Sequence, residues 1–172
     1  MKKALLALVV ALIFVPVSQG GAAAQHASDL PAHGVLAPGI SLAGVHIGDT
    51  TAKVKSAWGR NYKLCPDCKG TYWYYIYRTG EPLGAAVKFN KAGKVVAAFT
   101  LGSPTGWRTK EGLGMGEQIE KVTRLYGQVG WHVCIGYGAL SMRNGTTVTS
   151  IYTTGEAVYG FAITAPTESI CQ

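Results

Sequence analysis

Residues 44–59 read GVHIGDTTAKVKSAWG and residues 112–127 read GLGMGEQIEKVTRLYG, and the two stretches align without a gap. The aligned positions share glycines at both ends, an acidic residue, a Lys-Val pair and an aromatic residue before the last glycine. In each stretch apolar residues recur at the spacing of one helix face. An ungapped match of this length indicates a duplication, and each copy predicts a short helix that ends at a glycine.

Strand-like runs follow each predicted helix. They span residues 71–78, 83–90 and 94–101 in the first half, and 131–137, 139–143, 147–153 and 157–164 in the second. The turns between them are short, with Asn144-Gly145 the clearest, which implies antiparallel neighbours. The sequence therefore predicts an α+β fold. It would be a tandem repeat of a short helix plus antiparallel strands, at about 41–104 and 105–172, with both helices packed on one face of a continuous sheet.

The first 24 residues have the features of a secretory signal peptide. Two lysines precede an apolar run, and Ala22-Ala23-Ala24 offers the small residues that cleavage requires. The run is broken at Pro16, which favours cleavage over a membrane anchor. We expect a flexible lead-in at residues 25–40 and a single domain at 41–172. The protein would be secreted or extracytoplasmic, with no stable membrane span after cleavage.

The charged residues give no sign of a nucleic-acid partner. The chain has 16 Lys and Arg against 9 Asp and Glu, but the basic residues are scattered. No sequence motif of a hydrolase, zinc protease or nucleotide-binding loop is complete, and the glycine-rich run 112–117 fits a turn that enters a helix. The four histidines, His26, His33, His46 and His132, are dispersed. We therefore expect no enzymatic activity, cofactor or metal.

The run 71–78 is almost entirely aromatic. Alternation places Trp73, Tyr75 and Tyr77 on one face of this strand, and Tyr72, Tyr74 and Ile76 on the other. Ile76 favours burial of its own set, which would leave the other three as partner-binding residues on an open sheet face. The alternative, that both faces of the strand are packed, stays open.

Three more residues are candidates for the rim of that face. They are Arg78 and Glu81, next to the aromatic strand, and Trp107, which lies in a Pro/Gly-rich loop between the halves. Trp107 also has a structural interpretation, which we favour, because the junction between two repeats needs a large apolar residue.

The four cysteines allow three interpretations. Cys65-Pro66-Asp67-Cys68 could be a redox pair, half of a zinc site or a local disulfide. A thioredoxin-like motif would follow a strand and open a helix, whereas this one follows a helix. A zinc site would need Cys134 and Cys171 to converge on it. In a secreted chain we favour two disulfides, Cys65–Cys68 and Cys134–Cys171, the second of which would tie down the C-terminus.

The repeated pattern of glycine, acidic residue, short helix, aromatic residue and glycine resembles the tandem repeat of the β-lactamase inhibitory proteins. The same unit occurs singly in small outer-membrane assembly lipoproteins, and the resemblance covers about residues 41–165. It implies a non-enzymatic protein whose aromatic sheet face grips a partner protein while a loop inserts an acidic side chain. The aromatic run 72–77 matches that face in kind, and Glu81 would stand for the inserted carboxylate.

Together these observations predict a secreted, non-enzymatic, inhibitor-like module that binds another secreted or cell-surface protein, or a glycan, through an open aromatic sheet face. Two alternatives remain open. One is an extracytoplasmic thiol-disulfide protein that uses Cys65 and Cys68, and the other is a structural protein of the cell envelope.

Overall fold

The computed structural model describes residues 30–66, 68–75 and 84–172. Strands account for 46% of these residues and helices for 11%. The predicted signal peptide and His26 lie outside the described residues, as do Ile76, Tyr77, Arg78 and Glu81.

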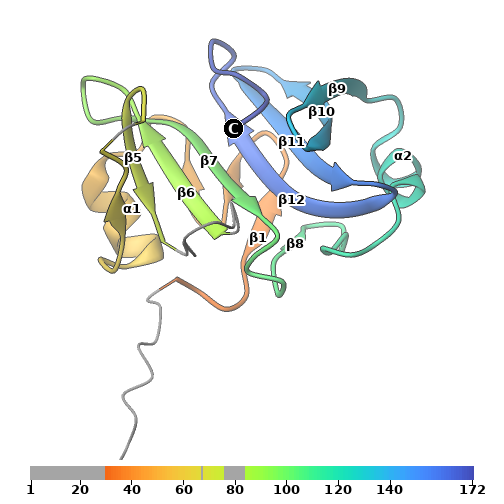
Figure 1. Ribbon diagram of the computed structural model, residues 1–172, viewed down its shortest axis with the longest axis horizontal. Coiled ribbons are helices and arrows are strands. Elements are labelled where there is room, and N and C mark those ends of the chain that lie inside the picture. Colours follow the sequence, from red (N-terminus) through yellow and green to blue (C-terminus); the bar gives the residue numbers. More distant parts are fainter. Residues whose placement is uncertain (1–29, 67, 76–83) are drawn as a thin grey trace, which may run out of the picture.

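The central element is an eight-stranded antiparallel sheet with the order β4-β5-β6-β7-β12-β11-β10-β9 (Figure 1). Its strands are β4 (Lys63–Leu64), β5 (Thr71–Tyr74), β6 (Gly84–Phe89), β7 (Val95–Leu101), β9 (Gly130–Cys134), β10 (Tyr137–Asn144), β11 (Thr147–Thr154) and β12 (Ala157–Thr164). Strands β7 and β12 pair in the middle, with Phe99 opposite Ala162. The hairpin turns that follow β10 and β11 contain Gly145 and Gly155 at positive φ, a conformation that glycine adopts without steric cost.

A second, smaller sheet has the order β3-β2-β1-β8. It consists of β1 (Val35–Ala37), β2 (Ser41–Leu42), β3 (Val45–His46) and β8 (Arg108–Thr109). Strand β1 lies within the predicted lead-in and pairs in parallel with β8, from the linker between the halves. The small sheet therefore joins two segments that are distant in the sequence.

Two short helices are present, α1 (Thr51–Trp58) and α2 (Glu120–Tyr126). The Thr50 side chain caps α1 by accepting a hydrogen bond from the Lys53 N–H. Each helix ends at a glycine with positive φ, Gly59 or Gly127, as the sequence predicts. Helix α1 buries Val54 and Trp58, whereas α2 buries only one side chain completely.

The predicted α+β repeat with a helical layer is wrong, and the architecture is mostly β. Helices of seven and eight residues are too short to cover an eight-stranded sheet. Much of the apolar cover comes instead from the small sheet and nearby loops, whose fully buried side chains are Leu36, Leu42, Val45, Trp107 and Leu113. Residues 35–46 lack a sustained strand pattern, and for this reason the small sheet was not predicted.

Candidate functional site

The face of the large sheet that points away from the small sheet carries most of the remaining aromatic side chains. We call this surface the tyrosine face, and it comprises Tyr72, Tyr74, Phe99, Tyr137, Tyr152 and Tyr159. The strand register places Tyr74, Ala86 and Phe99 in one row across β5, β6 and β7. Small residues such as Ala86 leave room for the large rings beside them. The tyrosine face is thus built from alternate residues of both halves of the chain.

The C-terminal segment, residues 165–172, crosses the tyrosine face. The Tyr152 hydroxyl donates to the carbonyl oxygen of Ile170 at 2.8 Å, and the Tyr137 hydroxyl donates to that of Gln172 at 2.7 Å. Figure 1 shows the C-terminus over the middle of the sheet. Burial raises the pKa of both tyrosines, so their hydroxyls stay protonated and able to donate. The segment buries Tyr152 and leaves Tyr137 partly exposed.

An ion pair holds the start of this segment. Lys88 Nζ lies 2.5 Å from a Glu168 carboxylate oxygen and 5.5 Å from the centre of the Tyr72 ring. The hydrogen bond to Glu168 raises the pKa of Lys88. Because its charge is paired, Lys88 contributes mainly its position over the aromatic ring.

The exposed part of the tyrosine face begins beside this ion pair. Tyr72 and Tyr74 are partly exposed, and their rings stack with centroids 5.9 Å apart. The Tyr74 hydroxyl lies 3.8 Å from Cys68 Sγ. Tyr159 is also partly exposed and packs against the same cluster. Together with Tyr137, these side chains present aromatic surface and hydroxyl groups on one face.

The structure inverts the predicted orientation of β5. Trp73 is 6% exposed and Tyr75 is 7% exposed, both in the core on the opposite face, so their assignment as open-face partner-binding residues is wrong. Trp73 stacks on Tyr62 with the ring centroids 3.9 Å apart. Tyr75 packs edge-on against Trp58 with the ring centroids 5.4 Å apart. Contacts with α1 and the loop after it therefore decide which face of β5 is buried.

Trp107 is also in the core rather than at a binding rim. Its ring is fully buried and packs against Trp58, with the ring centroids 5.3 Å apart. Its Nε1–H donates a 2.8 Å hydrogen bond to the carbonyl oxygen of Pro31. This is the position that the structural interpretation of Trp107 expects. No role at the rim of a binding surface remains for it.

The structure contains both disulfides that the sequence favours. Cys65 forms a disulfide with Cys68, at a sequence separation of 3, and Cys134 forms one with Cys171, at a sequence separation of 37. The second bond fixes the end of the C-terminal segment to β9. Disulfides are typical of proteins outside the cytoplasm. Among the described residues, no group of three or more His, Cys, Asp or Glu side chains could hold a metal ion.

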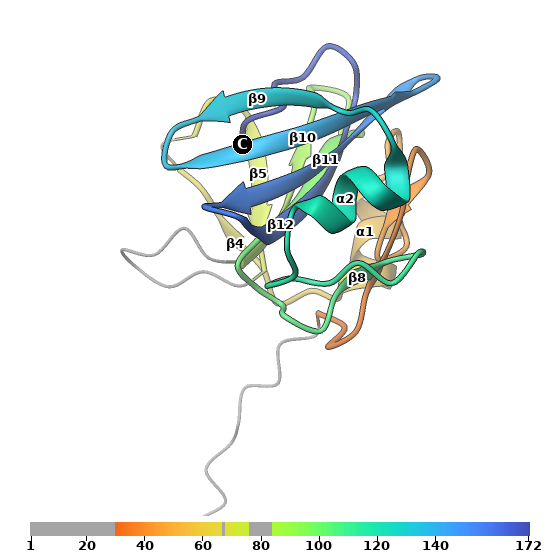
Figure 2. The ribbon, with the colours of Figure 1, turned by 90° about the vertical axis from the view of Figure 1, so that its right-hand side faces the viewer.

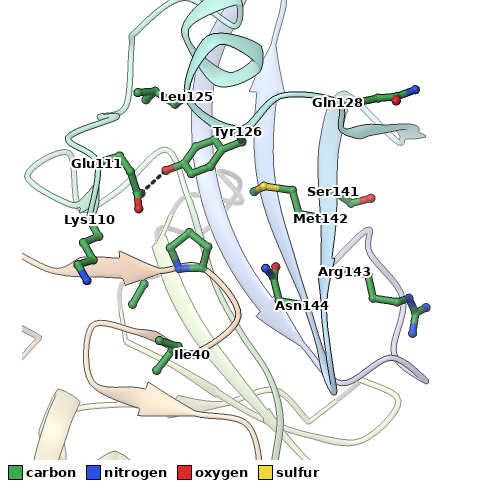
Figure 3. A pocket seen from close by; sticks show the side chains of 12 residues that line it. Ile40, Lys110, Glu111, Leu125, Tyr126, Gln128, Ser141, Met142, Arg143 and Asn144 are labelled. Atoms are coloured by element: carbon green, nitrogen blue, oxygen red, sulfur yellow. Dashed lines mark hydrogen bonds between the residues drawn. The ribbon is translucent and has the colours of Figure 1, made fainter.

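A cleft of about 610 Å³ lies on another part of the molecule (Figure 3). It is bounded by the β1–β2 turn, residues 110–111, the end of α2 and strand β10. Tyr126, Met142 and Asn144 point into it, whereas Ser141 and Arg143 point away. The Tyr126 hydroxyl donates to a Glu111 carboxylate oxygen at 2.6 Å. The size suits a small ligand, but two of the polar groups in the cleft, those of Tyr126 and Glu111, already bond each other.

One pair of side chains has the composition of a nucleophile and its base. His132 Nε2 lies 2.7 Å from Ser141 Oγ, across the β9–β10 pair. Within the described ranges, no carboxylate bonds the other ring nitrogen of His132, so the third member of a catalytic triad is missing there. The pair is explained as a cross-strand hydrogen bond within the sheet.

Sequence reasoning missed the tyrosine face because its residues are distant in the chain. Tyr137, Tyr152 and Tyr159 each look like ordinary strand residues, and only the pairing of β7 with β12 brings them near Tyr72 and Tyr74. The one available signal was the alternation in the aromatic run 71–78, where Ile76 favoured burial of the face that carries Tyr72 and Tyr74, and the structure buries Trp73 and Tyr75 instead.

No family model and no curated protein matches the chain. Among solved structures, a DUF4309 family protein from Bacillus subtilis aligns with a TM-score of 0.52 and 15% identity, over 72% of this chain and 84% of that one. An extracellular protein containing an SCP domain, from Bacillus anthracis, aligns with a TM-score of 0.51 and 12% identity over 70% of this chain. The present chain covers 44% of that protein. At these identities the likeness shows a shared fold only.

No helix in the described part of the chain has the length and apolar character that crossing a membrane requires.

Proposed function

We propose that this chain is a secreted, non-enzymatic binding protein that recognises another secreted or cell-surface protein through the tyrosine face. The observation that carries the proposal is the set of four partly exposed tyrosines, Tyr72, Tyr74, Tyr137 and Tyr159, on one face of a continuous sheet. Exposed aromatic surface on a folded domain usually marks an interaction site. The proposal keeps the expected open-face binding function and moves it to the other set of β5 side chains.

Tyrosine suits protein recognition for physical reasons. Each ring covers a large apolar area at low conformational cost, and the hydroxyl satisfies polar groups at the edge of a contact. Here the rings are also held in place before any partner arrives. Tyr72 stacks on Tyr74, and Tyr137 is hydrogen-bonded to Gln172, which adjoins the disulfide-bonded Cys171. Pre-organisation of this kind lowers the entropy lost on binding.

The charges near the tyrosine face support a protein partner over a polyanion. Among the described residues, Lys88 lies over the ring of Tyr72, and Glu168 pairs with it. A surface of paired charge and aromatic side chains matches the mixed apolar and polar composition of ordinary protein interfaces. The two disulfides support the extracytoplasmic location, because such bonds persist in oxidising compartments.

Affinity capture from the secreted and surface proteins of the host tests the proposal. The bait is the mature chain, compared with Tyr72→Ala/Tyr74→Ala and with Ile40→Ala, which alters a side chain that is 60% exposed beside the β1–β2 turn. We expect one discrete protein to be retained by the native bait and by Ile40→Ala, and lost with the tyrosine variant. Circular dichroism confirms that each bait is folded.

Two outcomes would contradict the proposal. Equal retention by the tyrosine variant would remove the tyrosine face from the binding site. Retention of a carbohydrate in place of a protein, with the same dependence on Tyr72 and Tyr74, would make the ligand a glycan.

A further inference from the structure

Strand β9 forms one edge of the large sheet and carries an unusual row of exposed apolar side chains. Trp131 is 54% exposed, Val133 is 83% exposed and Ile135, in the turn that follows, is 99% exposed. Trp131 and Val133 share one parity along the strand, so they project to the same side of the edge. Figure 2 shows β9 along the outer border of the sheet, with β10 as its neighbour on the inner side.

Strand β9 itself carries none of the usual features that prevent strand pairing, and the contact printed on its backbone from the described residues is that of Cys171 Sγ, 3.8 Å from the Val133 carbonyl oxygen. Natural edge strands carry charges, prolines or bulges, or are very short. Residues 125–142 contain no Asp, Glu, Lys or Arg, although the whole chain has 16 basic and 9 acidic residues. The pairing of β9 with β10 is regular from Cys134 opposite Tyr137 to Gly130 opposite Ser141.

The other edge of the same sheet shows the contrast. Strand β4 has only two residues, one of which is Lys63, so it offers little backbone for pairing and carries a charge. A short, basic edge repels a second strand of a positively charged protein. The charge distribution therefore separates one protected edge from one unprotected edge.

The Trp131 ring has a defined position on the unprotected edge. It lies over Gly138 of β10, where a Cβ atom would stand only 2.4 Å from the ring. The missing side chain at Gly138 leaves the space that the ring occupies beside the neighbouring strand. Trp131 is thus a pre-positioned contact residue and loses little freedom when a partner covers it.

We propose that β9 pairs in antiparallel fashion with β9 of a second copy of this chain. A twofold axis at His132 would place Trp131 of each copy opposite Val133 of the other, a pairing of aromatic and β-branched side chains that stabilises antiparallel sheets. The register makes the strand complementary to itself, and this is why a second copy is the occupant we propose. Two copies with the same net positive charge repel wherever basic residues meet, and β9 is an edge where none do.

Such a dimer would continue one sheet through both copies. Because the twofold axis of an edge-to-edge pair is perpendicular to the sheet, the tyrosine faces of the two copies would lie on the same side. The inference does not depend on the proposed function, since β9 and its exposed side chains lie outside the set that defines the tyrosine face.

Sedimentation equilibrium of the mature chain, up to about 1 mM, tests the proposal. We expect a monomer–dimer equilibrium whose dissociation constant rises about tenfold or more in Val133→Lys, because lysine places two like charges in the new strand pair. The matched control is Val35→Lys, which adds the same charge at a valine that is 53% exposed in the small sheet. This control should dimerise as the native chain does.

Tryptophan fluorescence gives an independent measurement. Of the four tryptophans, Trp58, Trp73 and Trp107 are buried and Trp131 is exposed. Acrylamide quenching should therefore decrease as the protein concentration rises through the dimerisation range, and the decrease should be absent in Val133→Lys.

Three results would overturn the proposal. A native chain that stays monomeric throughout has no self-pairing edge, and a dimer that Val133→Lys leaves intact uses another surface. If the native chain is monomeric and retains a different protein, and Val133→Lys does not retain it, the edge binds that protein instead of a second copy.

Discussion

The Tyr152 hydroxyl, in the middle of the large sheet, donates a 2.8 Å hydrogen bond to the carbonyl oxygen of Ile170 in the C-terminal segment. Two further links, the Tyr137–Gln172 hydrogen bond and the Cys134–Cys171 disulfide, hold the end of that segment on the same sheet face. The last residues of the chain are therefore part of the surface on which we place the binding site. They also account for the full burial of Tyr152 on a face that the small sheet does not cover.

Removal of the Tyr152 hydroxyl should destabilise the fold. In Tyr152→Phe the Ile170 carbonyl loses its hydrogen-bond donor, which should lower the free energy of unfolding by about 1 kcal/mol. Urea unfolding followed by circular dichroism measures the change. Tyr159→Phe is the matched control, because this tyrosine is only partly buried, and its change should be smaller. Equal losses in the two variants would contradict a specific role for the Tyr152–Ile170 bond.

The two disulfides should contribute unequally to stability. A disulfide that closes a longer loop restricts the unfolded chain more. The Cys134→Ser/Cys171→Ser variant removes a bond between residues with a sequence separation of 37, and its free energy of unfolding should fall by about 4 kcal/mol. The Cys65→Ser/Cys68→Ser variant removes a bond between residues with a sequence separation of 3, and its free energy of unfolding should fall by about 2 kcal/mol. Unfolding curves that rank the variants in the reverse order would show that the C-terminal bond is not the stronger constraint.

The Cys65 and Cys68 variant also tests the thiol-disulfide alternative. If the chain is a binding protein, Cys65→Ser/Cys68→Ser should retain the captured partner, provided the variant is folded. An insulin-reduction assay on the native chain should show no turnover above background. Catalytic turnover that disappears with the double variant would instead support a redox protein.

Opposite faces of β5 should respond differently to truncation. Trp73→Ala should lower the free energy of unfolding by about 3 to 5 kcal/mol, because it leaves a cavity beside Tyr62 and Phe89. Tyr72→Ala removes a partly exposed ring and should cost about 1 kcal/mol. Thermal or urea unfolding of the two variants measures both values. Comparable losses would mean that Tyr72 is as much a core residue as Trp73.

A buried carboxylate near α1 should make stability depend on pH. Burial raises the pKa of Asp49, but hydrogen bonds from the His46 backbone N–H and from Lys53 lower it more, so the net shift is downward. Its contribution is therefore fully present above the unfolded pKa of about 3.9 and is lost as the pH falls through the lower folded value. Asp49→Asn should cost about 1 kcal/mol in free energy of unfolding at neutral pH, and the cost should decrease as the pH falls below about 3.9. A loss that is independent of pH would exclude this linkage.

Local features of the fold could be predicted from the sequence. Glycines at 59 and 127 end the helices, Asn144-Gly145 turns a hairpin, and the spacing of the cysteines favoured the pairs that form. Each of these depends on the conformational or covalent preference of a few neighbouring residues. Such preferences act whatever the rest of the chain does.

Features that depend on distant contacts could not be predicted. Whether Trp73 or Tyr72 is buried depends on Tyr62 and on the small sheet that supports α1, and neither is apparent from the alternation in β5. Ile76, which decided the prediction, lies outside the described residues. The apolar stripe of α1 is buried, but the pattern did not reveal that strands from 35–46 and 108–109 supply much of the cover.

Site-specific photocrosslinking tests the binding site most directly. A photoreactive phenylalanine at position 74, on the tyrosine face, is compared with the same group at position 40, in the other layer. Each protein is exposed to the secreted and surface proteins of the host, illuminated and analysed by mass spectrometry. The account predicts a discrete protein adduct at position 74 and none at position 40. An adduct at position 40 alone, or equal labelling at both positions, would contradict a partner-binding tyrosine face.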